Sequence, residues 1–138
     1  MKHVAWTISA ILMFSTSGTF AAEKISPMTV TGATTVDTAT AKSLFDKKVI
    51  FVDPRNDKDW DAGRIPGAVH MDINKGAFTK DTLGVKVKKD QEVVMYCNGE
   101  KCLRSAEAAE KAISWGYSKV YYYRDGYPAW QAAQYPTE

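Results

Sequence analysis

Continuous apolar runs and helical patterns alternate along most of this chain. Val49–Val52 and Val93–Tyr96 are apolar without a polar face, which is typical of strands covered on both sides of a sheet. Between such runs, apolar residues recur at helical spacing, as at Ala106, Ala109 and Ala112. The pattern predicts strands over residues 30–35, 49–52, 68–71, 93–96 and 119–123, and helices over residues 39–46, 57–62, 104–115 and 127–133.

This alternation predicts the class of fold. The connections between the expected strands are too long for hairpins, so we expect an α/β fold with a mostly parallel central sheet and helices on both faces. Thr38 and either Asn56 or Asp57 are the expected N-caps of the first two helices, and Gly63 is expected to end the second. Residues 72–90, rich in lysine, predict a solvated loop with room for one turn of helix.

The first residues have the pattern of an export signal. Lys2 and His3 precede the apolar run Val4–Phe14, which is too short to span a bilayer, and small residues allow cleavage after Ala21. We therefore expect a signal peptide over residues 1–22, a loose lead-in over residues 23–33 and one domain over residues 34–138. The alternative is an N-terminal helix that packs on the domain or anchors it. Cleavage predicts a periplasmic or secreted protein without a stable membrane anchor.

Charge and cysteine content narrow the classes of function. The formal net charge is +2, and removal of the leader takes away one basic residue, Lys2, so nothing in the charge balance favours nucleic acid as a partner. The only cysteines, Cys97 and Cys102, are too close in sequence to staple a small secreted domain, and any disulfide between them is local. Two thiols with His70 remote in sequence do not form a recognisable metal site.

The most informative stretch follows the expected strand at Val93–Tyr96. Cys97 ends this strand, a polar loop follows, and a helix begins at Arg104. Loop amides and the amides at a helix N-terminus favour negative charge, so this order predicts an anion site in which Cys97 is a thiolate. The expected ligand site of a parallel sheet also lies beyond the carboxyl ends of its strands. The alternative for Cys97 is a buried structural cysteine.

Four stretches, in this order, resemble the rhodanese family. The resemblance covers residues 34–136 and rests on Asp53-Pro54-Arg55, on Trp60 to Ala68, on Tyr96-Cys97 with Arg104 to Ala109, and on Gly116-Tyr117 and Val120 with Asp125 to Trp130. It implies a rhodanese-like fold and sulfur transfer without a cofactor or a metal. The Cys97 thiolate would take a sulfane sulfur from a small anionic donor such as thiosulfate and pass it, as a persulfide, to a thiol or cyanide-like acceptor.

The resemblance also assigns roles to residues. Cys97 is the expected nucleophile, and the amides of the loop are expected to surround the transferred sulfur. The expected substrate-binding residues are Asn98, Gly99, Glu100, Lys101, Cys102, Leu103 and Arg104, with Lys101 or Arg104 binding the donor anion. The expected supporting residues are Asp53, Arg55, Arg64 and Ser105. From the residues alone, Asp53 and Arg55 are interpreted as an ion pair or as a brace for a neighbouring loop, and Arg64 as a surface cation.

Three departures from the family pattern leave other functions open. Arg64 replaces a usual histidine, Asp125 replaces a glycine, and Arg104 follows Cys97 by seven residues where the family usually has five. One alternative is an enzyme that resembles the phosphatases or arsenate reductases of this fold. Another is a redox or binding module in which Cys97 and Cys102 form a disulfide. Cys102 could also resolve a persulfide or sulfenate on Cys97, or be a passive thiol. The sequence does not indicate an oligomeric state.

Overall fold

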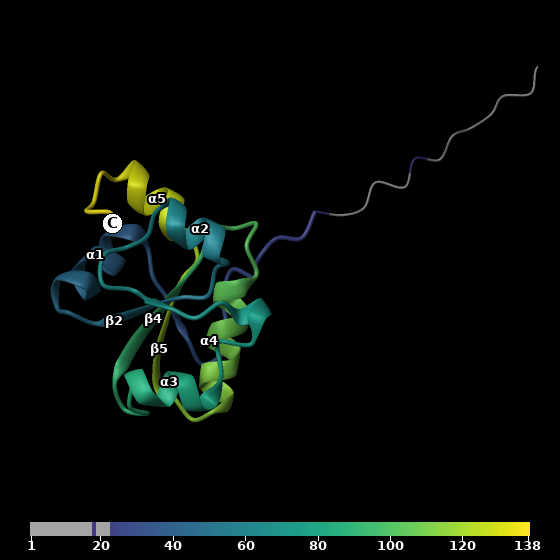
Figure 1. Ribbon diagram of the computed structural model, residues 1–138, viewed down its shortest axis with the longest axis vertical. Coiled ribbons are helices and arrows are strands. Elements are labelled where there is room, and N and C mark those ends of the chain that lie inside the picture. Colours follow the sequence, from purple (N-terminus) through teal and green to yellow (C-terminus); the bar gives the residue numbers. More distant parts are fainter. Residues whose placement is uncertain (1–17, 19–22) are drawn as a thin grey trace, which may run out of the picture.

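A five-stranded parallel sheet organises the chain, of which the computed structural model describes Gly18 and residues 23–138 (Figure 1). Apart from Gly18, the predicted signal peptide lies outside the described residues. None of the described helices is both long and apolar enough to cross a membrane. In chain order the elements are β1 (Thr34–Thr35), α1 (Thr38–Asp46), β2 (Ile50–Asp53), α2 (Asp57–Ala62), β3 (Val69–His70), the 3₁₀ helix η1 (Ile73–Lys75), α3 (Lys80–Lys86), β4 (Glu92–Tyr96), α4 (Arg104–Ser114), β5 (Lys119–Tyr123) and α5 (Gly126–Ala132).

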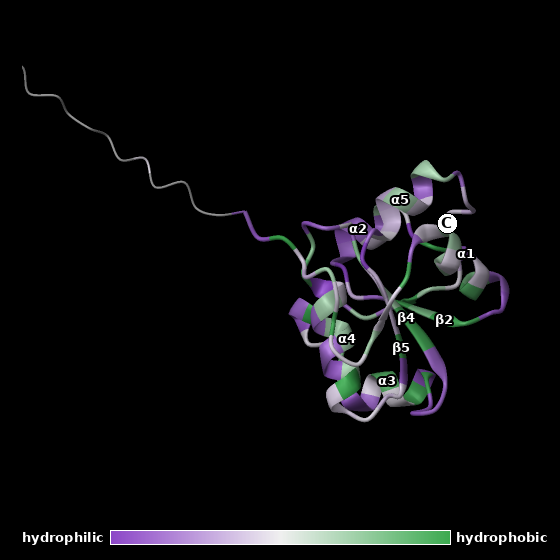
Figure 2. Ribbon diagram, turned by 180° about the vertical axis from the view of Figure 1, so that it is seen from behind, coloured by the Kyte–Doolittle hydropathy of each residue, from purple (hydrophilic) through white to green (hydrophobic). Residues whose placement is uncertain are grey.

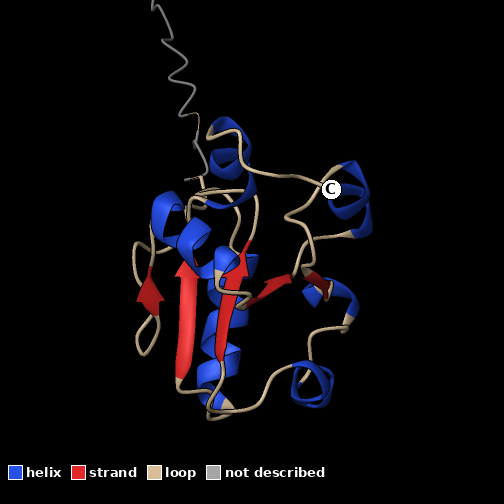
Figure 3. Cartoon of the chain, turned by 90° about the vertical axis from the view of Figure 1, so that its left-hand side faces the viewer, coloured by secondary structure: helices blue, strands red, loops and turns tan. Residues whose placement is uncertain are grey.

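The strand order is β1-β5-β4-β2-β3, and every neighbouring pair is parallel. β4 lies at the centre, where Val93 is aligned with Ile50 of β2 on one side and with Val120 of β5 on the other. The strands and the helices that cover them are seen from the side in Figure 3. β2, β4 and β5 begin and end within one residue of the predicted positions. The predicted α/β fold with a parallel sheet is therefore confirmed.

Side chains of β4 divide the core into two apolar clusters, one on each face of the sheet. Val93 and Met95 belong to the cluster covered by η1, α3 and α4, whereas Val94 and Tyr96 belong to the cluster covered by α1 and α5. This alternation follows from the period of two along a strand. Figure 2 shows the hydrophobic strands between the two groups of helices. Helices on both faces, as predicted, bury the apolar run from each side.

Residues 72–90 differ from the solvated loop that was expected. They contain η1 and two turns of α3, and they bury Phe78 and Leu83 in the core. Thr79 caps α3 in a capping box: its hydroxyl accepts from the amide of Thr82, and the hydroxyl of Thr82 accepts from the amide of Thr79. The lysines of this segment remain on its outer side. Because lysines are so frequent in this segment, its sequence predicted a solvated loop although apolar residues anchor a helix there.

The N-cap of α1 differs from the residue predicted from the sequence. Asp37, not Thr38, is the N-cap of α1, because its Oδ1 accepts a hydrogen bond of 2.8 Å from the amide of Thr40. This bond holds the pKa of Asp37 below its ordinary value. For α2, Asn56 is the N-cap and Gly63 follows the last turn, as expected. The expected strand over residues 30–35 is reduced to β1, because Val30 is buried in the core instead of pairing.

Candidate active site

Three strand ends meet at one edge of the sheet and position the candidate site. Cys97 directly follows β4, Asp53 is the last residue of β2, and Arg124 directly follows β5. Residues 97–103, here called the active-site loop, connect β4 to α4. A cleft of about 580 Å³ opens beside this loop. It is lined by Lys24, Asn56, Asp59, Asn74, Asn98, Lys101, Cys102, Leu103, Arg104 and Glu107.

Cys97 and Cys102 form a disulfide across the active-site loop, with their Cα atoms 6.2 Å apart. Cys97 is fully buried, whereas Cys102 is half-buried and lines the cleft. Cys97 belongs to neither apolar cluster, because its side chain is bonded across the loop. The free Cys97 thiolate expected from the sequence is therefore not present in this state. The local disulfide, which the sequence allowed as an alternative, is present instead.

The backbone of the loop has amides without a hydrogen-bond partner. Within the described chain, the amides of Asn98, Gly99, Glu100 and Lys101 donate no hydrogen bond. The amide of Cys102 was also expected to face the ligand, but it closes a turn on the carbonyl of Gly99 at 3.0 Å. The first amides of α4 are unpaired as well, as at any helix N-terminus, and they add the positive end of the helix dipole. This part of the site favours an anion.

Arg104 and Lys24 are the cations of the cleft that pair with no described carboxylate. With the amide of Asn74 oriented so that its oxygen faces Arg104, that oxygen accepts from Nη2 at 2.8 Å. Lys101 also lines the cleft, but its Nζ pairs with Glu23 at 2.9 Å. Of the two cations predicted for the donor anion, Arg104 is positioned and unpaired.

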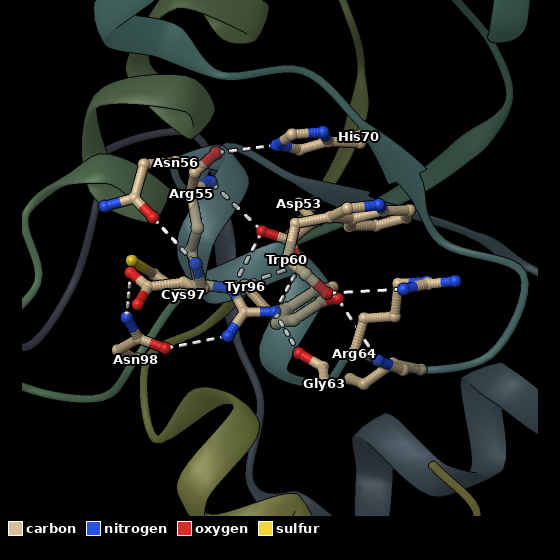
Figure 4. A network of polar contacts seen from close by, with 12 residues as sticks. Asp53, Arg55, Asn56, Trp60, Gly63, Arg64, His70, Tyr96, Cys97 and Asn98 are labelled. Carbon is tan, nitrogen blue, oxygen red and sulfur yellow. Dashed lines mark hydrogen bonds and ion pairs between the residues drawn. The ribbon is translucent and has the colours of Figure 1, made fainter. Parts of the chain in front are cut away.

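Asp53, Arg55 and Tyr96 form a buried brace behind the loop (Figure 4). The guanidinium of Arg55 binds both carboxylate oxygens of Asp53, with Nε 2.9 Å from Oδ1 and Nη2 2.7 Å from Oδ2. The hydroxyl of Tyr96 donates to Asp53 at 2.6 Å. Burial, and then the charge of Asp53, raise the pKa of Tyr96 above its ordinary value. The ion pair expected from the sequence is thus present, and it is almost fully removed from solvent.

This brace extends to the active-site loop through Asn98. Nη1 of Arg55 donates to Oδ1 of Asn98 at 2.9 Å, and Nη2 of Arg55 donates to the carbonyl of Gly63 at 2.7 Å. Nδ2 of Asn98 in turn donates to Asp59 of α2 at 2.9 Å. Asn98 is therefore held from two sides at the base of the loop. Asp53 and Arg55 are thus connected to the loop through Asn98, which is the contact that the bracing interpretation expects.

The lead-in, expected to be loose, packs against the outer side of the loop. Residues 23–30 are here called the N-terminal strap. The amide of Ser26 donates to the carbonyl of Glu100 at 2.7 Å, and Nη2 of Arg124 donates to the carbonyl of Ser26 at 3.1 Å. The hydroxyl of Tyr122 donates to the carbonyl of Pro27 at 2.9 Å. Figure 1 shows this segment running beside the loop that precedes α4.

Gly126, at the start of α5, allows the close approach of α5 to the loop. The amide of the next residue, Tyr127, donates to the carbonyl of Cys97 at 2.8 Å. A Cβ atom on Gly126 would lie 2.3 Å from this carbonyl oxygen, and the φ angle of +64° is one that favours glycine. The sequence showed Gly126 only as part of a family motif. Its role is to let α5 hold the end of β4.

Arg64 and Ser105, the other two expected supporting residues, are not part of the buried brace. Arg64 does not line the cleft: it packs over the ring of Trp60 at 4.5 Å and pairs with Glu138 at 3.5 Å, as expected of a surface cation. Ser105 lies in the first turn of α4, and its hydroxyl is buried without a described partner. Trp60 also stacks on His70, with ring centroids 4.6 Å apart.

Several residues that shape the site were not found from the sequence. Asn74 was assigned to a solvated loop, and Ser26 to a loose lead-in. Asp59 had no role in the sequence analysis, although its position after the N-cap Asn56 placed it near the carboxyl end of β2. Among the described residues, no three His, Cys, Asp or Glu side chains gather as a metal site.

Comparison with known proteins identifies a family. The sequence profile of the rhodanese-like domain matches residues 37–133. A tRNA uridine(34) hydroxylase of Streptococcus pneumoniae is 34% identical over 79 residues, which are 54% of this chain and 24% of that protein. The HTH-type transcriptional regulator Rv0324 of Mycobacterium tuberculosis is 32% identical over 91 residues, 66% of this chain and 38% of that protein. The chain thus spans about a quarter to two-fifths of the length of these relatives.

Solved structures agree with this match. A protein of unknown function from Rhodopseudomonas palustris, described as a possible tyrosine phosphatase, has a TM-score of 0.64 and 30% identity, and the alignment covers 81% of this chain and 98% of that one. The human single-domain sulfurtransferase TSTD1 has a TM-score of 0.60 and 25% identity, covering 72% of this chain and 96% of that one. Both relatives are nearly as short as the matched domain.

Proposed function

Since this chain belongs to the rhodanese-like domain family, we propose that it is a sulfurtransferase that carries a sulfane sulfur as a persulfide on Cys97. The donor is a small anion such as thiosulfate, and the acceptor is a thiol or a cyanide-like nucleophile. The observation that supports this proposal is the position of Cys97, between the end of β4 and a loop with unpaired amides that leads into α4.

The first half of the reaction loads the sulfur. The Cys97 thiolate attacks the sulfane sulfur of thiosulfate, a new S–S bond forms, and the old S–S bond breaks as sulfite leaves with its electron pair. The unpaired amides of the loop and the N-terminus of α4 stabilise the negative charge on the sulfur, and Arg104 binds the anionic part of the donor. In the second half, the acceptor attacks the outer sulfur and restores the thiolate. The expected kinetics are ping-pong.

The disulfide must be reduced before this cycle can start. In the disulfide, Cys97 has no thiolate to attack a donor, and its sulfur is fully buried. We therefore expect activity to depend on prior treatment with a thiol reductant. This dependence separates the present proposal from a purely structural disulfide.

The test is intact-mass spectrometry of the reduced protein after brief exposure to thiosulfate, with the reductant removed. We expect one added sulfur atom on wild type and on Cys102→Ser, and none on Cys97→Ser. Thiosulfate:cyanide sulfurtransferase activity should likewise disappear in Cys97→Ser. Activity retained by Cys97→Ser, or the absence of any added sulfur on reduced Cys102→Ser, would rule out the proposal. Circular dichroism of each variant serves as the folding control.

Export to the periplasm or the medium is part of the same proposal. It rests on the basic start, the apolar run Val4–Phe14 and the small residues before Glu23. The intact mass of protein isolated from the native host reports whether cleavage follows Ala21. A mass that includes the whole leader would contradict export with cleavage.

A phosphatase-like activity is the second candidate, and one observation favours it. The loop is longer than usual for a sulfurtransferase of this family, and it ends at Arg104, an unpaired cation that lines the cleft. Hydrolysis of an aryl phosphate by the reduced protein, lost in both Cys97→Ser and Arg104→Ala, would support it. Sulfur uptake without such hydrolysis would instead support the sulfurtransferase.

A further inference from the structure

The two cysteines of the disulfide have different access to solvent. Cys97 is fully buried at the end of β4, and it does not line the cleft. Cys102 is half-buried and lies on the wall of the cleft. A molecule that enters the cleft therefore meets Cys102 and not Cys97. The two cysteines are not interchangeable in any reaction with an external thiol, because access decides which sulfur is attacked.

The loop is also held in place by contacts that do not involve the disulfide. Asn98 is bound by Arg55 and Asp59, and the carbonyl of Glu100 accepts from Ser26. None of these contacts uses a sulfur atom, so reduction of the disulfide removes no partner from them. With their Cα atoms 6.2 Å apart, within the usual range for a disulfide, Cys97 and Cys102 remain able to form the bond again.

We propose that Cys102 is a resolving thiol that converts the sulfur carried by Cys97 into hydrosulfide. This inference rests on the proposed function. The Cys102 thiolate attacks the inner sulfur of the Cys97 persulfide, so that the Cys97–Cys102 bond forms and the persulfide S–S bond breaks. The outer sulfur leaves with both electrons and takes a proton from water. Two thiols are thereby oxidised to the disulfide of the structure, and one sulfane sulfur is reduced.

An external dithiol completes the cycle. One thiolate of the reductant attacks the sulfur of Cys102, because Cys102 lines the cleft and Cys97 is buried, and Cys97 leaves as a thiolate. The charge of this leaving group arises next to the unpaired loop amides and the N-terminus of α4, which stabilise it. The second thiol of the reductant then releases Cys102. Its two electrons restore the dithiol, and the reductant leaves as a disulfide.

A single-turnover experiment tests the resolving role. Reduced protein, freed of reductant, receives thiosulfate, and both hydrosulfide and the intact mass are followed with time. We expect wild type to gain one sulfur, then to lose it as one hydrosulfide per chain, and to end as the disulfide. Cys102→Ser and Cys102→Ala should gain the sulfur and keep it, with hydrosulfide no higher than in a protein-free sample. Val85→Ser, on the exposed side of α3, is the matched control and should behave as wild type.

The outcomes separate this inference from the proposed function. If the reduced Cys102 variants gain no sulfur and wild type releases no hydrosulfide, the sulfurtransferase proposal fails, and this inference fails with it. If wild type gains sulfur and the Cys102 variants release hydrosulfide as fast as wild type, only the resolving role is overturned. A persulfide that stays on wild type without hydrosulfide overturns it equally.

The site of attack by the reductant is tested on the oxidised protein. A brief treatment with an excess of the monothiol glutathione, acid quenching and peptide mapping locate the mixed disulfide. We expect the adduct on Cys102. An adduct predominantly on Cys97 would contradict the order of access inferred from burial.

Discussion

The active-site loop is held from two sides by contacts of different physical kinds. On the inner side, the buried brace uses charged groups removed from water: Arg55 is 2% exposed and Asp53 is fully buried. On the outer side, the N-terminal strap uses backbone hydrogen bonds and exposed ion pairs, such as Glu23 with Lys101, each 66% exposed. Buried charged partners depend strongly on each other, whereas exposed pairs contribute little. The base of the loop is therefore fixed with the fold, and its outer part is held weakly.

Removal of one partner from the brace should have the largest effect. Asp53→Ala leaves the buried guanidinium of Arg55 without its carboxylate and removes the acceptor of the Tyr96 hydroxyl. We expect the free energy of unfolding to fall by about 3–5 kcal/mol, the usual cost of leaving a buried charge unpaired. Urea titration measures this change.

The exposed pair of Lys42 with Asp46 on α1 provides the control. Asp46→Ala should cost less than about 1 kcal/mol, as is usual for surface pairs. Equal losses of unfolding free energy from Asp53→Ala and Asp46→Ala would show that the buried brace is no stronger than a surface pair.

Alkaline pH should lower the free energy of unfolding by less than Asp53→Ala does and by more than Glu23→Gln does. The pKa of Tyr96 is raised in the folded protein by burial and by Asp53, from an ordinary value of 10.0. Above pH 10 the unfolded chain loses this proton while the folded chain keeps it. Stability is therefore complete below pH 10 and falls as pH rises, by up to ~1.4 kcal/mol per pH unit for this one group.

Urea titrations of the oxidised protein between pH 9 and pH 11 measure this slope. Burial also raises the pKa of Tyr123, to about 12, so part of the slope belongs to that residue. Tyr96→Phe, although less stable at neutral pH, should show a shallower decline, and Tyr123→Phe should retain the part due to Tyr96. An unchanged slope in Tyr96→Phe would contradict the role given to this hydroxyl.

Removal of an ion pair from the strap should have the smallest effect. Glu23→Gln breaks the exposed pair with Lys101, and we expect stability to fall by less than about 1 kcal/mol. High salt should have little further effect on the variant, because the interaction that salt would screen is already gone. A loss as large as that of Asp53→Ala would mean that the strap holds the loop as firmly as the brace does.

The sheet and the position of Cys97 could be predicted from the sequence because both depend on local patterns. The apolar runs of β2 and β4 fix which segments are buried, and a cysteine after such a run must lie at the carboxyl edge. α3 was missed because Gly84 and several lysines mask its apolar face, although Leu83 is fully buried. A lysine can lie beside a buried apolar residue on such a helix, because its aliphatic stem packs there while its charged end reaches water.

The contacts around the loop could not be predicted in the same way. Arg55 binds Asn98 across 43 positions, and the amide of Ser26 meets Glu100 from the other end of the chain. No local pattern encodes such pairs, since they depend on how the strand ends come together. Whether Cys97 and Cys102 bond likewise depends on the path of the loop between them. The sequence therefore left the disulfide as one of several alternatives.

The pairing of β1 with β5 also has a consequence for how the protein folds. Among the described residues, the first strand, β1, is aligned with the last, β5, Thr34 with Tyr121, and β4 has β5 as its neighbour on that side. During synthesis, the sheet cannot close until the C-terminal residues have left the ribosome. Until then the hydrophobic strand β4 has an open edge, which can pair with other chains. Folding of this domain is therefore a late event that involves the whole chain, and nascent or truncated chains are the species most prone to aggregate.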